Sequence, residues 1–381
     1  MAQSTDALPI TPAVVQWARV RAGFSIEDAA KLFKKIAAWE AGEAAPSYPQ
    51  LEQMAEKFKC PVAVFFFPSP PNVPSVEQSF RTLTAQDFAA IPRTVRTFLR
   101  RGQAMQLNLA ELNDGKNPAG RVITRDLKVS ATASLDSVAA QVRKYLGVSI
   151  KEQASWKTPE RALEAWRDVF AQVGVYVFKD AFHATNYFGF CLYDDEFPII
   201  YVNNSSSKTR QIFTLFHELG HLLFHTSGID VLNDEYIQHL PANEQRIEVL
   251  CNGLAARVLV PDDVFDSVMK GRAADRETAA ALAQHFGVSR EVIYRKLLDR
   301  GEIDATEYTA AAKFWESQIK PRESGSGNYY NSHYAYLGSR YIDLAFTRYY
   351  QRRFDDLQLA EYLNIKPKNL PTFEAKFGAG A

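Results

Sequence analysis

Residues 213–223, which read FTLFHELGHLL, constrain this chain more than any other stretch because they contain the pattern H-E-x-x-H. On a helix, residues four apart lie on one face, so His217 and His221 can aim imidazole nitrogens at one metal ion. Glu218 lies between them, within reach of a water on that metal. Two imidazoles, a carboxylate and a water position form a catalytic zinc site. The pattern is a metalloprotease signature in which Glu218 is the general base.

The sequence predicts that this segment is a helix. Ser205, Ser206 and Ser207 offer hydroxyl groups that can cap its start. Apolar residues then recur at spacings of three and four, at positions 212, 215, 216, 219, 222 and 223. Gly220 costs about 1 kcal/mol of helix propensity. We therefore expect a packing reason for this glycine, the close approach of a neighbouring backbone.

A third ligand is expected on the next helix, which the apolar periodicity places at residues 243–260 and which Pro261 ends. Glu248 shares a face of this helix with Cys251 and Asn252. A carboxylate on such a small, apolar face is costly to bury unless it binds a metal or a cation. We therefore expect Glu248 to be the third ligand, with Cys251 and Asn252 beside the metal.

Alternatives exist for the third ligand and for the group that stabilises the oxyanion. Glu244 lies one turn before the favoured carboxylate on a similar face. His225 lies about 12 Å from His217 along the helix, too far to share a zinc with both histidines of the motif. Tyr236 and His239, in the segment between the two helices, are the candidates for oxyanion stabilisation.

The run FTLFHELGHLL, followed by E-x-x-C-N-x-L-A-A-x-V-L-V-P, resembles the ImmA/IrrE family of metallopeptidases over roughly residues 160–300. The resemblance implies zinc ligands at His217, His221 and Glu248 and a catalytic glutamate at Glu218. Cys251 stands where the family usually has alanine. The resemblance also implies a narrow protein substrate, typically a helix-turn-helix repressor encoded nearby. Its cleavage would derepress stress, phage or mobile-element genes.

Composition limits the other function classes. Lys plus Arg and Asp plus Glu are equal at 44 each, so the 381-residue chain has no net charge that would favour nucleic acid overall. Three cysteines fit a reducing compartment. The first residues lack a basic and an apolar signal region, and no run reaches 18 apolar residues. These features predict a soluble, cytoplasmic protein that contacts no membrane.

The predicted fold is α+β and mostly helical, with a zincin-like peptidase core and a small antiparallel sheet. Strands are expected at 174–178, 188–193 and 198–202, with 188–193 as the edge that pairs with an extended substrate. The expected segments are a degenerate XRE-like helix-turn-helix module (1–70), a helical linker domain (71–155), the zinc peptidase core (156–268), a second helix-turn-helix-like module (269–305) and a C-terminal helical extension (306–381).

The two helix-turn-helix-like modules raise the possibility of DNA contact. Residues 10–66 resemble the XRE type, but the interval from Ser25 to Trp39 is about four residues shorter than two helices and a turn need. Residues 276–300 repeat the pattern around a Gly287 turn. We expect the N-terminal module to position the peptidase or its protein partner. A non-catalytic, zinc-containing DNA-binding regulator or antitoxin remains the alternative function.

Overall fold

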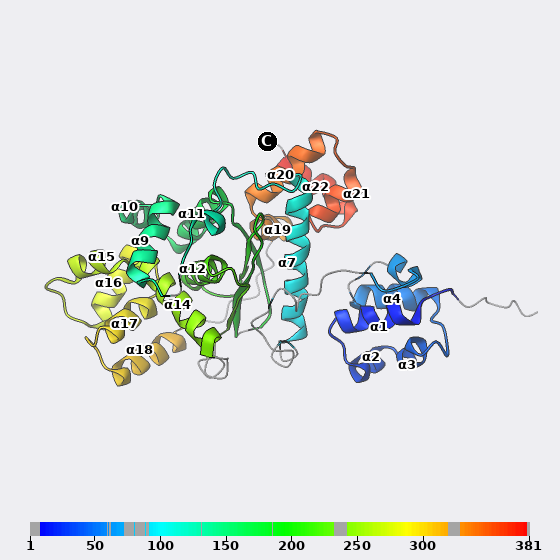
Figure 1. The fold of residues 1–381 in the computed structure, drawn as a ribbon, viewed down its shortest axis with the longest axis horizontal. Helices are drawn as coiled ribbons and strands as arrows, with labels where there is room; N and C mark the ends of the chain where they lie inside the picture. Colours follow the sequence, from blue (N-terminus) through cyan, green and yellow to red (C-terminus); the bar gives the residue numbers. More distant parts are fainter. Residues whose placement is uncertain are drawn as a thin grey trace, which may run out of the picture. The chain divides into compact units, whose positions relative to one another are not determined.

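The computed structural model describes residues 8–378, apart from 59, 61, 72–79, 81–87, 89–90, 131, 185, 232–241, 319–327 and the side chains of 242–244 and 316. The chain divides into two compact units (Figure 1). The smaller unit comprises Met1–Gln78 and Leu83–Arg100, and the larger comprises Ser79–Thr82 and Arg101–Ala381. The boundary falls within helix α7 (Arg93–Leu112).

The smaller unit is a helical module with its own apolar core. Its elements are α1 (Pro12–Arg21), α2 (Ile26–Leu32), α3 (Ile36–Glu40), α4 (Tyr48–Phe58) and the 3-10 helix η1 (Val62–Phe66). Ser25 caps α2 by accepting a hydrogen bond from the Asp28 amide. The helix after the turn, α3, has only 5 residues. The shortened interval in the sequence therefore does give a shortened helix.

The larger unit contains a four-stranded sheet in the order β1-β3-β2-β4. The strands are β1 (Tyr176–Asp180), β2 (Tyr187–Leu192), β3 (Ile199–Asn203) and β4 (Ile229–Val231). The three predicted strands are confirmed to within two residues, whereas β4 was not predicted because it has only 3 residues. The α+β, mostly helical fold class is also confirmed.

The structure corrects two expectations about this sheet. It is mixed, because β3 lies between β1 and β2 and pairs in parallel with β1 and antiparallel with β2. The segment 188–193 is also not an edge, because β4 pairs with β2 on its other side. Both errors arise because strand order depends on contacts between distant segments, which the alternation of residues within one strand does not encode.

Helices cover both faces of the sheet (Figure 1). On one face lies α12 (Lys208–Leu223), which carries the histidine motif. On the other face, Gly102 of α7 lies so close to the sheet that an added Cβ would be 2.8 Å from the ring of Phe190. The remaining helices of the larger unit are α8 (Ile123–Asp126), α9 (Leu135–Leu146), α10 (Ile150–Ser155), α11 (Pro159–Gln172), α14 (Ala242–Leu259), α15 (Asp262–Met269), α16 (Arg276–Phe286), α17 (Arg290–Asp299), α18 (Ala305–Ser317), α19 (Tyr329–Leu337), α20 (Ser339–Tyr350), α21 (Asp356–Tyr362), η2 (Pro367–Asn369) and α22 (Leu370–Phe377).

Helix α12 is the centre of this unit. Ser207 caps it by accepting a hydrogen bond from the Arg210 amide, so the predicted serine cap is confirmed. Its Phe216 ring packs edge-on against Trp166 and Phe170 of α11 at centroid distances of 4.7 and 5.3 Å. Such aromatic contacts add to the apolar area that the helix buries. The buried flank of α12 therefore fixes its rotation relative to α11.

The predicted second helix pair is confirmed as α16 and α17. Gly287 ends α16 in the left-handed region, at a φ of +66°, which glycine adopts without steric cost. Two basic residues of α17, and Arg300 directly after it, are held by carboxylates. Lys296 lies 2.7 Å from Asp262, Arg300 lies 2.9 Å from the same carboxylate, and Arg295 lies 3.0 Å from Asp299.

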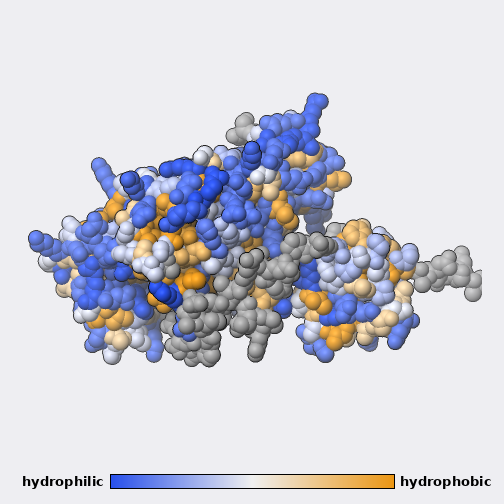
Figure 2. Space-filling model, viewed as in Figure 1, coloured by the Kyte–Doolittle hydropathy of each residue, from blue (hydrophilic) through white to orange (hydrophobic). Residues whose placement is uncertain are grey.

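None of the described helices combines the length and the apolar character needed to cross a membrane. On the face shown in Figure 2, hydrophilic residues cover much of each unit, and apolar residues form small patches among them. Exposed apolar residues scattered in this way are usual on a protein surface.

Candidate metal centre

The two histidines of the motif lie on one face of α12, and a glutamate from α14 faces them. His217 and His221 are 2% and 4% exposed. The Nε2 atoms of the two rings lie 3.2 Å apart. The Glu248 carboxylate lies 3.3 Å from Nε2 of His217 and 3.2 Å from Nε2 of His221. The structure thus brings together the three residues that the sequence nominates as ligands.

These three distances fit a tetrahedral metal ion. Ligand atoms at 2.0–2.1 Å from a tetrahedral zinc ion are about 3.3–3.4 Å apart along each edge. The observed separations of 3.2, 3.2 and 3.3 Å are close to that value. Within the described part of the chain, this cluster of His217, His221 and Glu248 is the group of side chains that could hold a metal ion.

The Glu218 side chain is buried beside the cluster of His217, His221 and Glu248. It is 0% exposed. Neither carboxylate oxygen has a well-formed hydrogen bond to the described residues, and the Cys191 thiol is its polar neighbour. Burial raises the pKa of Glu218, against the opposing charges of the two histidines. A buried carboxylate without well-formed hydrogen bonds is costly, so this one is available to a water molecule at the neighbouring cluster.

Neighbouring groups orient both imidazole rings. Nδ1 of His217 lies 2.9 Å from the Asn252 amide oxygen, which makes it the donor and leaves Nε2 for a metal. Nδ1 of His221 lies 3.5 Å from the Thr226 hydroxyl, a weaker contact. Gly228 lies against the same ring, and a Cβ there would be 2.5 Å from it. Asn252 was a sequence candidate for this region, whereas Thr226 and Gly228 were not.

A second polar group beside the cluster was also not found from the sequence. Asp230 of β4 is 4% exposed and accepts hydrogen bonds from Arg210 at 2.7 and 2.9 Å. It also accepts one from the Thr214 hydroxyl at 2.7 Å. Burial lowers the pKa of His217, but the negative charges of Asp230 and Glu248 outweigh burial and raise it overall. The sequence signal for the Asp230 group is limited to the spacing of residues 210, 214 and 217, which places them on one face of a helix.

Two buried thiols flank the metal helix. Cys251 packs against Gly220, where an added Cβ would be 2.9 Å from its sulfur and 3.1 Å from its Cα. This confirms that Gly220 allows a neighbouring backbone to approach. Cys191 lies next to Glu218, and burial raises its pKa well above the usual range. Cys251 lies beside His221, yet it is not among the three residues whose ligand atoms converge.

The remaining sequence candidates fall outside this cluster or outside the described residues. Tyr236 and His239 lie in the segment 232–241, which the structure does not describe, and so does the side chain of Glu244. His225 stacks on Tyr193 at a centroid distance of 4.9 Å, and its Nε2 lies 3.2 Å from the Thr124 carbonyl oxygen. The expectation that His225 packs and does not join the histidine cluster is therefore confirmed.

An HExxH helix packed on a mixed sheet, with a glutamate from the following helix, defines the class of the HExxH metallopeptidases. Within that class, residues 170–298 match the model of the IrrE N-terminal-like domain family, Peptidase_M78. Residues 170–298 are therefore similar to this family, which confirms the resemblance to the ImmA/IrrE family that the sequence indicated. The match ends at residue 298, in the last turn of α17.

Two curated relatives are similar to part of the chain. The "Radiation response metalloprotease IrrE" of Deinococcus radiodurans is 34% identical over 98 residues, which is 26% of this chain and 30% of the relative. The protein of the same name from Deinococcus deserti is 34% identical over 109 residues, 28% of this chain and 38% of the relative. The matched part thus spans about a third of the length of these relatives.

Proposed function

We propose that this chain is a zinc-dependent endopeptidase that cleaves a specific protein partner. The observation that carries the proposal is the cluster geometry together with the buried Glu218 carboxylate, whose oxygens have no well-formed hydrogen bond to the described residues. His217, His221 and Glu248 would hold the ion through Nε2, Nε2 and a carboxylate oxygen. Zinc in such a site lowers the pKa of a bound water and polarises a carbonyl group.

Each neighbouring residue has a defined part in this proposal. Glu218 accepts the proton of the attacking water and later delivers it to the leaving amine. Asn252 fixes the tautomer of His217, and Gly228 leaves room for the ring of His221. The burial that raises the pKa of Glu218 suits this role, because a base with a pKa nearer neutrality both accepts and releases a proton at physiological pH.

The proposed substrate is a helix-turn-helix transcriptional repressor encoded nearby, and the proposed role is control of stress, phage or mobile-element genes in the cytoplasm. The names of the two Deinococcus relatives, which refer to a radiation response, support a stress-related role. The alternative is a non-catalytic DNA-binding regulator or antitoxin. Lys296 and Arg295 of α17, and Arg300 directly after it, form ion pairs with carboxylates. These ion pairs disfavour DNA binding by α17.

The test compares metal content with cleavage of the repressor. The purified chain should hold one zinc, and His217→Ala or His221→Ala should remove it. Glu218→Gln should keep zinc and lower the cleavage rate by about 10²–10⁴-fold, because the carboxamide cannot accept the proton. Zinc loss in Glu218→Gln, with both histidine variants fully loaded, would refute the assignment. Promoter binding that depends on salt, without any cleavage, would favour the regulator instead.

A further inference from the structure

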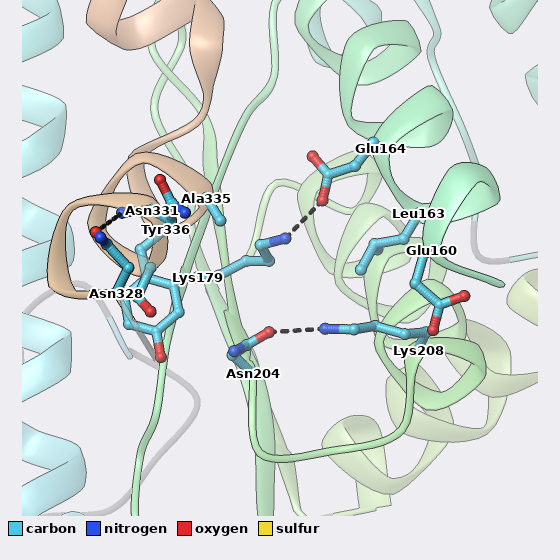
Figure 3. A pocket seen from close by; sticks show the side chains of 11 residues that line it. Glu160, Leu163, Glu164, Lys179, Asn204, Lys208, Asn328, Asn331, Ala335 and Tyr336 are labelled. Carbon is cyan, nitrogen blue, oxygen red and sulfur yellow. Dashed lines mark hydrogen bonds and ion pairs between the residues drawn. The ribbon is translucent and has the colours of Figure 1, made fainter. Parts of the chain in front are cut away.

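A cavity of about 400 Å³ with four charged residues in its lining, Glu160, Glu164, Lys179 and Lys208, lies in the larger unit. It opens between α11 and α19, over the ends of the parallel strands β1 and β3 (Figure 3). Lys179 of β1 and Lys208 of α12 extend into the space between these helices. The volume falls within the range of pockets that hold small molecules. Crevices at the carboxyl ends of parallel strands are frequent ligand sites.

The two lysines make this cavity electrostatically unusual. The side chain of Lys179 is only 3% exposed, and its Nζ lies 2.6 Å from a carboxylate oxygen of Glu164. Arg167 holds the other oxygen of that carboxylate at 2.8 Å, so two cations share one anion. Burial, together with the positive charges of Arg167 and Lys208, lowers the pKa of Lys179 to about 8. An additional negative charge beside Lys179 would therefore be favourable.

The remaining walls supply further features of a binding site. Lys208 donates a hydrogen bond to the Asn204 amide oxygen at 2.9 Å. It is also the first residue of the 16-residue helix α12, whose amino-terminal end favours negative charge. Across the cavity lie Asn328, whose amide oxygen caps α19, and the Asn331 amide and Tyr336 phenol of α19 itself (Figure 3). These side chains can donate and accept hydrogen bonds and provide one aromatic surface.

We propose that this cavity binds a small organic anion, whose phosphate or carboxylate group lies between the ammonium groups of Lys179 and Lys208. The polar remainder of the ligand contacts the side chains of α19. Lys208 is the first residue of α12, which carries the histidine cluster. A ligand that contacts both Lys208 and α19 therefore connects these two helices. An effect of the ligand on cleavage would rest on the proposed peptidase function, but binding itself does not.

The test measures binding of two probes to the full chain by calorimetry, at constant ionic strength in sodium chloride. The probes are glycerol 2-phosphate and succinate, which separate a phosphate site from a carboxylate site. Saturable one-to-one binding of either probe is expected. Lys208→Met should weaken it about tenfold or more because one of the two cations is lost, and Lys179→Met should act in the same direction. Lys144→Met, on the exposed side of α9, is the matched control and should bind normally.

A substitution that is expected to strengthen probe binding distinguishes loss of the binding site from loss of the fold. Glu160 lines the same cavity and carries a negative charge, so Glu160→Gln should tighten probe binding several-fold. The probe should also slow amide hydrogen exchange in α19, since the ligand contacts this helix. Absence of saturable binding by both probes would overturn the proposal, and so would unchanged binding by Lys208→Met. Because binding is measured without a substrate, these results stand whether or not the chain proves to be a peptidase.

Discussion

At the scale of single residues, the metal centre depends on side chains that orient the ligands. Asn252 accepts from Nδ1 of His217 at 2.9 Å, and Glu248 faces both rings. Burial opposes ionisation of Glu248, but the two histidines hold its pKa well below the usual range. Groups of this kind keep ligands in position before a metal arrives, so their removal should affect metal affinity more than folding.

Asn252→Ala tests this inference. Without the amide oxygen, His217 loses the hydrogen bond that fixes its tautomer and ring orientation, and zinc affinity should fall by about 10–100-fold. Competition with a chromophoric chelator measures the change. Asn369→Ala, at the start of α22 with no side-chain cap bond, is the control and should bind zinc normally. Equal affinity in Asn252→Ala and the unsubstituted protein would show that the amide does not orient the ligand.

Gly228→Ala tests the space beside the other ligand. The added Cβ would lie 2.5 Å from the His221 ring, so the ring or the backbone just before β4 has to shift. Overpacking of this kind costs about 1–3 kcal/mol of folding free energy, and we expect a lower melting temperature in the metal-free protein and weaker zinc binding. Gly120→Ala, which meets nothing within 4 Å, is the control. A Gly228→Ala protein that matches this control in both measurements would contradict the packing explanation.

At the scale of elements, ion pairs connect α15 to α17. Asp262 at the start of α15 lies 2.7 Å from Lys296 and 2.9 Å from Arg300. Burial raises the pKa of Asp262, but hydrogen bonds from these two cations outweigh it and hold the pKa well below its usual value. A network that shares one carboxylate contributes more than isolated surface pairs do. Lys296 and Arg300 therefore belong to the packing of the larger unit.

Asp262→Asn should destabilise the larger unit at neutral pH. The pKa of Asp262 is lower in the folded chain than in the unfolded one, so its contribution is present above the unfolded pKa of about 4 and is lost as the pH falls below it. The difference in melting temperature between the variant and the unsubstituted protein should shrink accordingly in acid. Asp299→Asn removes an exposed pair and should have little effect. A difference that persists unchanged at low pH would exclude this electrostatic origin.

At the scale of the whole molecule, the chain combines two units with separate cores. The core of the smaller unit is formed by α1 to α4 and η1, while the sheet and the metal helix lie in the core of the larger unit. Because the smaller unit has its own buried core, its contribution to function can be separated from metal binding. Its 5-residue α3 spans about 7.5 Å, little more than one turn.

Deletion of residues 1–70 should therefore leave zinc content unchanged and impair cleavage of the neighbouring repressor, because the module positions the peptidase or its partner. A helix as short as α3 presents few side chains to a major groove. Zinc analysis and a cleavage time course measure the two effects. The reverse result would be a gel shift in which the full chain, but not the deletion variant, binds the adjacent promoter and not a scrambled duplex at physiological salt. That result would show that the module reads DNA.

The sequence by itself determined the parts of this protein that depend on local spacing. The interval of four between His217 and His221 fixes a shared helix face, and the serine cap and apolar period place α12. The carboxylate on a small, apolar face selected Glu248, which the structure brings to within 3.3 Å of both rings. The bounds of α14, predicted at 243–260 and found at Ala242–Leu259, follow from the same periodicity because helical hydrogen bonds connect near neighbours.

Only the tertiary structure decided which distant segments meet. It places β3 between β1 and β2 and pairs β4 with the other edge of β2. It also brings Asp230 and Gly228 to the metal helix. It pairs Lys296 of α17 with a carboxylate of α15, and places α19 across a cavity from α11. Residue periodicity describes one element at a time, whereas these contacts depend on how apolar faces from separate elements pack together.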